Sequence, residues 1–435
     1  MDSPIGAGAG GPAPADRLRI LLATSDLFPP FRPAAKAIFA EELTRRGHRI
    51  DWLMQAESPD EPAGPRAFGN GVAHLAATDA GATRLRRLRK HWLDFRNDCK
   101  VFGLLKRGDY SLVQVKDKYL GALLAIAAAK RHRVPFFYWL AYPHADASLY
   151  AASHGVARYR LLYLARGKLQ KLLLLKVIMP AAAHVFVQSE QMREDLAAEG
   201  VPRDKMTPVP SSLNLKDLET PPGERPSVDK PADERWLLYL GTLIRERQLD
   251  FLVRVLAAVR RSEPAAKLLF VGRGEMPEDE GRLMGEAERL GVADAVRITG
   301  WMPMKEAWEY VRRADVCLSP YCPIPILRST SPTKLVEYMA LGKAVVANDH
   351  PEQSLVLRHS GAGLVSPWEE EPFAEAVLAI LRDEAGAEAM GRAGRAFVEQ
   401  YRTHSRLGDV VESAYRKVLE DTVGGARRPA WGVPE

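Results

Sequence analysis

The stretch that decides the fold is Ser331-Pro-Thr-Lys-Leu-Val-Glu-Tyr-Met-Ala-Leu-Gly-Lys-Ala-Val-Val-Ala-Asn348. It follows an apolar run, Asp315-Val-Cys-Leu-Ser-Pro320, which has the composition of a buried strand. Ser331 is a good helix N-cap, Pro332 suits the first turn, and Gly342 is a good helix stop. The Ala-Val-Val-Ala run after that glycine is a second short strand pattern. The stretch therefore predicts a strand, a loop, a helix and a strand in succession.

The start of this predicted helix is suited to an anion. Its free N–H groups from Ser331 to Thr333 and the positive end of its dipole can hold a phosphate, and Lys334 adds a mobile cation. Glu337 lies one turn further in, where its carboxylate can accept hydrogen bonds from a ribose diol. The competing interpretation of Glu337 is a surface ion pair with Lys334 at i,i+3 spacing. Phosphate and diol together indicate a nucleotide.

Length and composition indicate a globular protein of two domains. The chain has 435 residues, a formal net charge of +6 and ordinary apolar content, so phosphate-bearing partners or anionic membranes are favoured. Its three cysteines, Cys99, Cys317 and Cys322, are scattered without metal-type spacing, which favours a reducing, cytoplasmic setting. No apolar run is long enough to span a bilayer, and the start lacks the pattern of a signal peptide.

Short apolar runs, such as Leu18–Thr24, Ser111–Val115 and Trp236–Leu240, are predicted to be strands. They alternate with helical patterns along the chain, which is typical of parallel α/β domains. A polar, Pro-rich segment interrupts this rhythm and is predicted to be a linker. We expect a disordered tail (1–16), an N-terminal Rossmann-like domain (17–214), the linker (215–235), a C-terminal domain (236–395), a helix that crosses back to the first domain (396–421) and a flexible tail (422–435). Doubly wound sheets bind ligands at the carboxyl ends of their strands, so two such domains facing a central cleft are expected.

An ordered series of motifs then resembles glycosyltransferase family 4. In the second half it comprises Tyr239-Leu-Gly-Thr-Leu-Ile-Arg-Glu-Arg-Gln-Leu-Asp-Phe-Leu252, Leu269-Phe-Val-Gly-Arg-Gly274, Val296-Arg-Ile-Thr-Gly-Trp301, Ala314-Asp-Val-Cys-Leu-Ser-Pro320 and the stretch quoted first. In the first half it comprises Phe28-Pro-Pro-Phe31, Gly47-His48 and Val187-Gln-Ser-Glu-Gln-Met192. The order of the series is more specific than any single piece. The resemblance implies a GT-B fold, a nucleotide-sugar donor, no metal or other cofactor, and transfer with retention of anomeric configuration.

The resemblance also implies site residues. Donor-binding positions are Gly241, Thr242, Arg247, Gly272, Ser331, Thr333, Lys334 and Glu337, and Arg247 is also expected to act in catalysis. A cation beside the departing diphosphate would stabilise the charge that develops there. Arg32 and Lys36, in a segment that replaces the family's usual Gly-Gly turn, are expected to contact phosphate or acceptor.

The chain departs from the family pattern at two further places. Ser329 stands eight positions before Glu337, where many members have a glutamate, and Thr242 stands where an arginine is common. Arg247 matches a usual lysine and keeps a cation with a fork that can grip two phosphate oxygens. These departures motivate an alternative function, a non-catalytic nucleotide-sugar-binding subunit of a glycosyltransferase complex.

His144 and Asp146 are the catalytic candidates of the first domain, in the loop Trp139-Leu-Ala-Tyr-Pro-His-Ala-Asp146 after a predicted strand. The family often places a histidine near here, in contact with the donor sugar. Asp146 competes for that role, and a loop histidine capped by Asp146 is the structural alternative.

Two basic stretches bear on membrane contact. From Arg84 to Arg107, Leu85, Leu88, Trp92, Phe95, Cys99 and Phe102 form one apolar helical stripe among many Arg and Lys residues. A core-packed helix and a helix bound to anionic lipid are both consistent with this pattern. The second stretch, Arg158 to Lys176, contains Leu172-Leu-Leu-Leu175 and is predicted to be a buried helix.

These observations favour a metal-independent, retaining hexosyltransferase or related glycosyltransferase. Its acceptor is expected to be a saccharide, or a lipid-linked saccharide in polysaccharide or glycolipid synthesis, at the inner face of a plasma membrane. A nicotinamide dehydrogenase would need a Gly-x-Gly-x-x-Gly turn after the first strand, where the chain has Ser25-Asp-Leu-Phe-Pro-Pro30. Neither a hydrolase triad nor a nucleic-acid-binding pattern is found.

Overall fold

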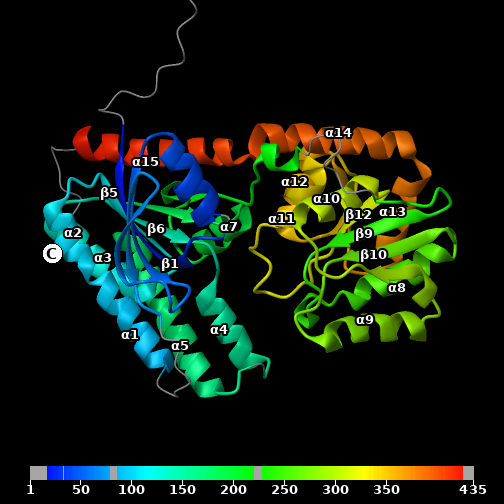
Figure 1. The fold of residues 1–435 in the computed structure, drawn as a ribbon, viewed down its shortest axis with the longest axis horizontal. Helices are drawn as coiled ribbons and strands as arrows, with labels where there is room; N and C mark the ends of the chain where they lie inside the picture. The colour runs from blue at the N-terminus through cyan, green and yellow to red at the C-terminus, as the bar shows by residue number, and fades with distance from the viewer. Residues whose placement is uncertain (1–16, 33, 79–85, 156, 220–227, 425–435) are drawn as a thin grey trace, which may run out of the picture. The chain divides into compact units, whose positions relative to one another are not determined.

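The protein is described by a computed structural model that covers residues 17–32, 34–78, 86–155, 157–219 and 228–424 (Figure 1). The chain forms two compact units: unit 1 contains residues up to Val209 and from Leu407 onward, and unit 2 runs from Pro210 to Arg406. The tails predicted at 1–16 and from 425 onward lie outside the described residues. The chain therefore leaves unit 1 once and returns to it once.

Unit 1 is built on an eight-stranded sheet in the order β3-β4-β2-β1-β5-β6-β7-β8. All pairs are parallel except the antiparallel pair β3 and β4. The strands are β1 (Arg19–Phe28), β2 (Arg49–Ala56), β3 (Gly64–Phe68), β4 (Gly71–Ala76), β5 (Leu112–Lys116), β6 (Phe136–Leu140), β7 (His184–Val187) and β8 (Met206–Pro208). The order reverses between β1 and β5, which makes this pair the switch point of the sheet.

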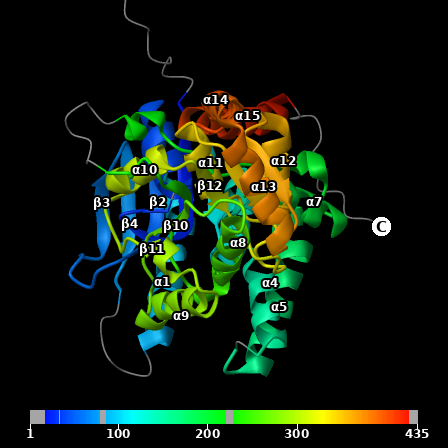
Figure 2. The same ribbon diagram turned by 90° about the vertical axis from the view of Figure 1, so that its right-hand side faces the viewer.

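Helices cover both faces of this sheet (Figures 1 and 2). They are η2 (Ala34–Leu43), α1 (Arg86–Asp98), α2 (Lys100–Arg107), α3 (Tyr119–His132), α4 (His144–Ser153), α5 (Arg160–Leu173), η3 (Leu174–Ile178), α6 (Met179–Ala181), α7 (Glu190–Ala198) and η4 (Arg203–Lys205). Alternate residues of β1 enter different cores: Leu21 packs with α2, α3 and α7, whereas Ile20 packs with η2 and the C-terminal helix. This alternation is the period-two pattern of a strand buried on both sides.

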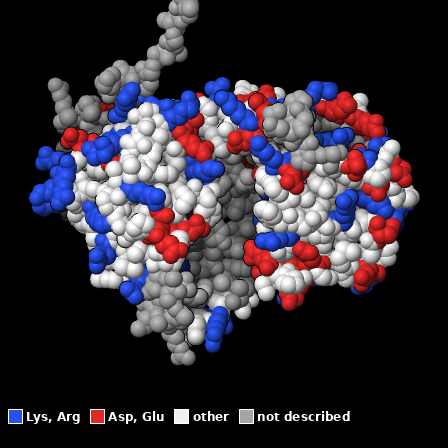
Figure 3. All heavy atoms as spheres, viewed as in Figure 1, with Lys and Arg blue, Asp and Glu red and all other residues white. Residues whose placement is uncertain are grey.

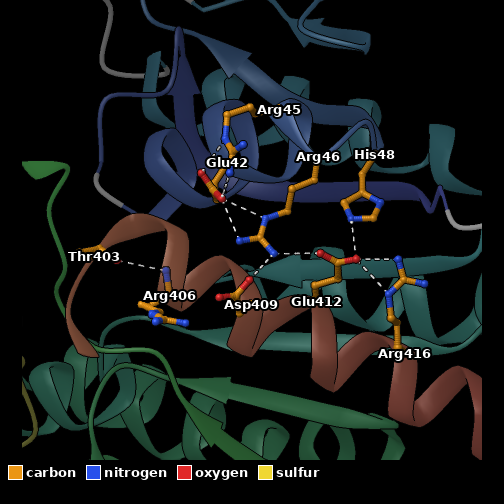
Figure 4. Close-up of polar contacts among 9 residues, drawn as sticks. All are labelled: Glu42, Arg45, Arg46, His48, Thr403, Arg406, Asp409, Glu412 and Arg416. Carbon is orange, nitrogen blue, oxygen red and sulfur yellow. Dashed lines mark hydrogen bonds and ion pairs between the residues drawn. The ribbon is translucent and has the colours of Figure 1, made fainter. Parts of the chain in front are cut away.

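The C-terminal helix α15 (His404–Gly424) completes unit 1. From Leu407 onward it packs on the sheet, and its Tyr415 is fully buried between Phe137 and Phe186. Figure 4 shows the polar edge of this contact, where the Arg46 guanidinium bridges Glu42, Asp409 and Glu412. The C-terminal helix, far in sequence from the strands of unit 1, is thus joined to that unit by both apolar and ionic contacts.

Unit 2 has a six-stranded parallel sheet in the order β11-β10-β9-β12-β13-β14. The strands are β9 (Arg235–Leu240), β10 (Ala266–Val271), β11 (Val296–Ile298), β12 (Val316–Ser319), β13 (Val345–Asn348) and β14 (Gly363–Ser366). In chain order this is 3-2-1-4-5-6, the arrangement of a dinucleotide-binding sheet. Its switch point lies between β9 and β12.

Helices also cover both faces of the unit 2 sheet. They are η5 (Leu215–Leu218), η6 (Arg245–Arg247), α8 (Asp250–Arg260), α9 (Pro277–Arg289), η7 (Ala293–Ala295), α10 (Met304–Arg313), α11 (Thr333–Ala340), α12 (Pro351–Ser360), α13 (Glu370–Arg382) and α14 (Glu384–Tyr401). One core contains α8, α9 and α13, and the other contains α10, α11, α12 and α14. Both units are therefore doubly wound, as predicted.

The boundaries between the units differ from the predicted ones. The chain crosses to unit 2 after Val209, before the linker predicted at 215–235, because Leu218 is buried in the unit 2 core and Leu213 and Leu215 pack against it. It returns within α15, whereas the returning helix was predicted over 396–421. Residues 396–401 belong to α14, and α15 continues to Gly424, past the predicted start of the tail at 422.

The two basic stretches also differ from their predictions. Arg84 and Leu85 lie outside the described residues. The rest of the Arg84–Arg107 stretch is divided between α1 and α2, with Trp92 exposed and Phe102 packed against the core. Lys and Arg side chains gather over α2 in Figure 3. The prediction that the Arg158–Lys176 stretch forms a buried helix is wrong, because four leucines of its helix α5 are exposed. Among the described helices, none combines the length and apolar character needed to cross a bilayer.

Candidate functional site

A pocket of about 820 Å³ opens at the carboxyl ends of β9 and β10 in unit 2. It is lined by the turn at Gly241 and Thr242 after β9, the turn from Gly272 to Gly274 after β10, and the side chains of Trp301 and Lys334, among others. We call it the switch-point pocket, because β9 is one of the two strands at the switch point of the sheet. Crevices in this place bind nucleotides in doubly wound folds.

Glycine is required at two positions of this pocket. Gly241 and Gly272 have φ values of 151° and 148°, in the region that side chains with a Cβ rarely adopt. A Cβ added at Gly272 would lie 2.0 Å from the carbonyl oxygen of Gly241, so the two turns touch through their backbones. The absence of side chains leaves backbone open to a ligand in the pocket.

Lys334 and Glu337 are one turn apart on α11. Lys334 lines the switch-point pocket, and its Nζ donates to Glu337 Oε2 at 3.3 Å. The ion pair proposed as the structural alternative is therefore present. However, Glu337 is only 8% exposed, so the pair is not a surface pair. A buried carboxylate with one bond to a lysine retains acceptor capacity for ligand hydroxyls.

Arg247 belongs to η6, directly after the first glycine turn. Its Nη1 donates to the Tyr239 hydroxyl at 2.6 Å and lies 3.0 Å from where a Cβ on Gly241 would stand. Burial raises the pKa of Tyr321 to about 12, and the positive charge of Arg247 opposes this rise. Glu337 acts on the same phenol, so Arg247 and Glu337 both lie near Tyr321. Of the predicted donor residues, Gly241, Thr242, Gly272 and Lys334 line the switch-point pocket. Arg247 lies against Gly241, and Glu337 is bonded to Lys334.

Ser331 does not cap helix α11 as predicted; together with Thr333 it contacts Ser211. The α11 helix begins at Thr333 with Pro332 as the N-cap, and the Ser331 hydroxyl accepts from the Ser211 N–H at 2.9 Å. The Ser211 hydroxyl in turn donates to the Ser331 carbonyl at 2.8 Å and lies 3.0 Å from Thr333 Oγ1. The N-cap prediction at Ser331 was wrong because the hydroxyl holds the 210–212 segment instead.

The two departures from the family pattern also lie in unit 2. Thr242 is exposed and lines the switch-point pocket, where an arginine is common in the family. Ser329 is buried, with a side chain shorter than the glutamate that it replaces. Arg247 and Lys334 are the cationic side chains from the predicted donor set.

In unit 1, His144 is the first residue of α4, just beyond β6. Its ring packs edge-on against Tyr142, with ring centroids 5.0 Å apart. Burial lowers the pKa of His144; Asp117 acts to raise it, while Arg32, Arg166 and Lys116 lower it further. The imidazole is therefore neutral near pH 7 and available as a proton acceptor.

Asp146, Arg32 and Lys36 each have a different charged partner and do not line one pocket. The Asp146 carboxylate is half exposed and accepts from Lys171 Nζ of α5 at 3.0 Å, so it does not cap His144. Arg32 Nε lies 3.6 Å from Asp26 Oδ1. Lys36 lines a separate shallow hollow of about 450 Å³ and is 3.8 Å from Glu41. Of these three, Arg32 is electrostatically coupled to His144.

A buried ionic cluster that the sequence reasoning missed lies at the unit 1 switch point. Lys116 Nζ, at the end of β5, donates to Asp26 Oδ2 at 2.9 Å and to Asp117 Oδ2 at 3.3 Å. Asp117 has a φ of 56°, and its Oδ1 accepts from the Ala141 N–H at 2.9 Å. The charged run Lys116-Asp117-Lys118 directly after a predicted strand was the available signal, since it ends a strand at the ligand-binding edge.

Two solved structures have a fold similar to that of this chain. Sucrose-phosphate synthase from Thermosynechococcus elongatus matches with a TM-score of 0.69 and 20% identity, over 93% of this chain and 99% of that one. HepE from Anabaena, solved in complex with UDP, matches with a TM-score of 0.63 and 14% identity, over 92% and 100%. The fold is therefore GT-B, as the resemblance implied.

Both halves of the chain also match described domain families. Residues 38–211 match the Glycosyl transferase 4-like domain, and residues 234–383 match Glycosyl transferases group 1. Each match covers less than half of the chain, so the chain has a GT-B fold with one match to a glycosyltransferase-type domain in each half.

Two individual proteins are also similar in sequence to parts of the chain. The chain is 27% identical over 258 residues to D-inositol 3-phosphate glycosyltransferase of Segniliparus rotundus, covering 58% of this chain and 54% of the relative. It is 32% identical over 202 residues to phosphatidyl-myo-inositol mannosyltransferase of Mycolicibacterium smegmatis, covering 45% and 47%. The matches thus span about half the length of these relatives.

Proposed function

We propose that the chain is a glycosyltransferase that takes its sugar from a nucleoside-diphosphate sugar bound in the switch-point pocket. The observation that carries this proposal is the convergence of two touching glycine turns, Lys334 and the buried Glu337 at the carboxyl edge of a dinucleotide-type sheet. Backbone N–H groups and a lysine suit a diphosphate, and a carboxylate suits a ribose diol.

Transfer breaks the bond between the anomeric carbon and a diphosphate oxygen, and the bonding electrons leave with the diphosphate. Negative charge grows on that oxygen, so Arg247 and Lys334 are expected to lower the barrier by stabilising the departing group. The acceptor hydroxyl oxygen bonds to the anomeric carbon, and its proton passes to the departing diphosphate. Retention of configuration, metal independence and roles for His144 and Asp146 at the donor sugar are parts of the proposal that rest on the family resemblance.

We further propose a lipid-linked saccharide as the acceptor, in polysaccharide or glycolipid synthesis at the cytoplasmic face of a membrane. Support comes from the basic helices of unit 1 and from a relative whose name specifies a phosphatidyl-myo-inositol acceptor. The membrane role predicted for residues 84–107 stays a prediction, and Trp92, 61% exposed on α1, is consistent with it.

One experiment tests this function. Calorimetry with UDP, GDP, ADP and the corresponding nucleotide-sugars should find one nucleoside diphosphate that binds, and incubation with the matching sugar donor should release it. Binding without any release, with or without acceptor lipid extracts, would instead favour the non-catalytic subunit motivated by Ser329 and Thr242. Absence of nucleotide binding would contradict both functions.

A further inference from the structure

The α4–α5 hairpin presents an apolar face that no described part of the chain covers. The inner side of α5 is fixed against α4 at Gly167, where an added Cβ would lie 2.8 Å from Leu149 Cδ2 and 3.1 Å from the Ala145 carbonyl oxygen. The outer side carries Leu161, Leu162, Leu169 and Leu172, which are 80%, 63%, 56% and 56% exposed. The helix is thus amphipathic with its apolar face turned outward.

These leucines form one band along the helix. Positions 161, 162, 165, 169 and 172 follow the three- and four-residue steps that place side chains on a single helical face. Exposed single leucines are common on protein surfaces, but a contiguous band of four is a sign of an interaction surface. Tyr159, 59% exposed, extends the band at the tip of the hairpin.

The charges around the band have one sign. From Ala147 to Ser189 the sequence has no Asp or Glu, and its Arg and Lys residues are Arg158, Arg160, Arg166, Lys168, Lys171 and Lys176. Lys171 is neutralised by Asp146 and Glu199, at 3.0 and 2.6 Å. Within the described residues, Lys168 and Lys176 are exposed and have no recorded carboxylate partner. The apolar band is therefore flanked by uncompensated positive charge.

We propose that this face of α5, which we call the leucine face, docks the protein on anionic lipid bilayers. Leucines that enter the acyl boundary and flanking cations that meet lipid phosphates are the two components of interfacial binding. A second copy of the chain is a poorer occupant, because two such helices would bring their cations together without an acid to balance them. The hairpin projects from the sheet of unit 1 in Figures 1 and 2, as insertion requires.

The leucine face is close to the candidate residues of unit 1. Arg166 of α5 lowers the pKa of His144, so the two side chains are within electrostatic range. Asp146 of α4 is joined to α5 by Lys171. A bilayer on the leucine face would thus contact the helix that packs on α4, with α5 standing between the bilayer and the residues that we assign to the sugar. Docking on a bilayer rests on the proposed function only in so far as a lipid-linked acceptor would lie in that bilayer.

The test is vesicle cosedimentation of the full chain, with phosphatidylcholine vesicles and with vesicles containing phosphatidylglycerol. The wild type should prefer the anionic vesicles, and high salt should weaken binding. Leu161→Gln/Leu172→Gln should reduce the partition coefficient by about tenfold or more, because two apolar anchors are lost. Lys168→Gln/Lys176→Gln should reduce it by about tenfold on anionic vesicles and little on neutral ones.

The matched control is Val410→Gln, since Val410 is an exposed apolar residue of α15, at the opposite end of unit 1 in Figures 1 and 2. It should leave vesicle binding unchanged. Nucleotide calorimetry on every variant separates docking from the proposed function: retained nucleotide binding with lost vesicle binding supports the leucine face. Three outcomes would overturn the proposal: a wild type that ignores anionic vesicles, wild-type binding to anionic vesicles by either double variant, or a self-association that Leu161→Gln/Leu172→Gln dissolves.

Discussion

The ion pair between Lys334 and Glu337 joins the two residues that we propose for the diphosphate and the ribose of the donor. The lysine Nζ donates to the carboxylate at 3.3 Å, and the carboxylate is almost wholly buried. A diphosphate would compete for the lysine, while a ribose would take acceptor positions on the carboxylate. Each side chain is thus the polar partner of the other until a ligand offers both of them new partners.

Replacing Glu337 with Gln should weaken binding of the preferred nucleoside diphosphate by about 1.5–3 kcal/mol, because charge-assisted bonds to the ribose are lost. Calorimetry measures the change, and circular dichroism checks the fold. Glu280→Gln is a matched control, since Glu280 lines the same pocket but bonds the Gly274 N–H. Unchanged nucleotide affinity in a folded Glu337→Gln protein would rule out the ribose role.

Arg247→Ala should lower kcat more than it lowers donor affinity, because the cation is expected to matter most as charge develops on the departing diphosphate. Tyr239→Phe removes the hydroxyl that Arg247 Nη1 contacts at 2.6 Å and should give a smaller effect in the same direction. Steady-state kinetics and donor calorimetry give the two quantities. An equal loss in both would identify Arg247 as a ground-state phosphate anchor.

At the scale of elements, the contact between η2 and α15 depends on Arg46. Its guanidinium lies 2.7 Å from Asp409, 3.0 Å from Glu412 and 2.8 Å from Glu42. Arg46→Ala leaves three carboxylates close together and should reduce the free energy of unfolding by about 2 kcal/mol. Urea titration measures this reduction.

The control for Arg46→Ala is Arg392→Ala, since Arg392 forms an exposed pair with Glu388 at 3.6 Å. That substitution should change the free energy of unfolding by less than about 0.5 kcal/mol. If the two substitutions had equal effects, the ionic contact with α15 would be contributing nothing beyond a surface pair.

His184 at the start of β7 should make the stability of unit 1 dependent on pH. Burial lowers its pKa to about 4; the charges of Lys417 and Lys205 lower it further, and Asp204 opposes them. Between the unfolded value near 6.5 and the folded value, only the unfolded chain binds the proton, so stability falls as the pH is lowered through this window. His184→Gln should reduce that fall.

The measurement is the urea midpoint at about pH 7.5 and about pH 5, compared between wild type and variant. Other buried histidines, such as His48 and His74, also have a lowered pKa, so the dependence should shrink without vanishing. Exposed His154→Gln is the control. A variant with the wild-type pH dependence would contradict the assignment.

The sequence predicted strands well where both faces are buried, because runs such as Leu18–Thr24 and Trp236–Leu240 have an unambiguous pattern. It missed β3 and β4, whose composition is mixed, and β8 and β14, which are short. Helix faces were less predictable. The periodicity of α5 is equally consistent with an inward or an outward leucine face, and only the position of Gly167 against α4 decides between them.

In unit 2 the motifs predicted positions that the fold brings together, since Gly241, Gly272 and Lys334 follow the carboxyl ends of three strands and line one pocket. Their role in donor binding stays a prediction. The site was less predictable in unit 1. The cluster of Lys116, Asp26 and Asp117 is assembled from two strands that are neighbours only in the folded sheet. Asp146 was assigned by its position near His144, but its partner Lys171 is 25 residues away.

At the scale of the whole molecule, transfer should not require a divalent metal. The proposed donor site supplies cations from Arg247 and Lys334, which would stabilise the departing diphosphate in place of a metal ion. A glycosyl-transfer assay in excess chelator should retain its rate. A loss of activity that manganese or magnesium restores would contradict this prediction.

The return of the chain to unit 1 at Leu407 has a consequence for biosynthesis. On the ribosome, the whole of unit 2 is translated before the last helix of unit 1 emerges. Until then, the groove between Phe137 and Phe186 lacks the Tyr415 ring that fills it. During synthesis, unit 1 therefore has aromatic surface uncovered until its last helix is made. A chain that terminates before Leu407 would contain a folded unit 2 and an incomplete unit 1, which would be prone to chaperone binding and proteolysis.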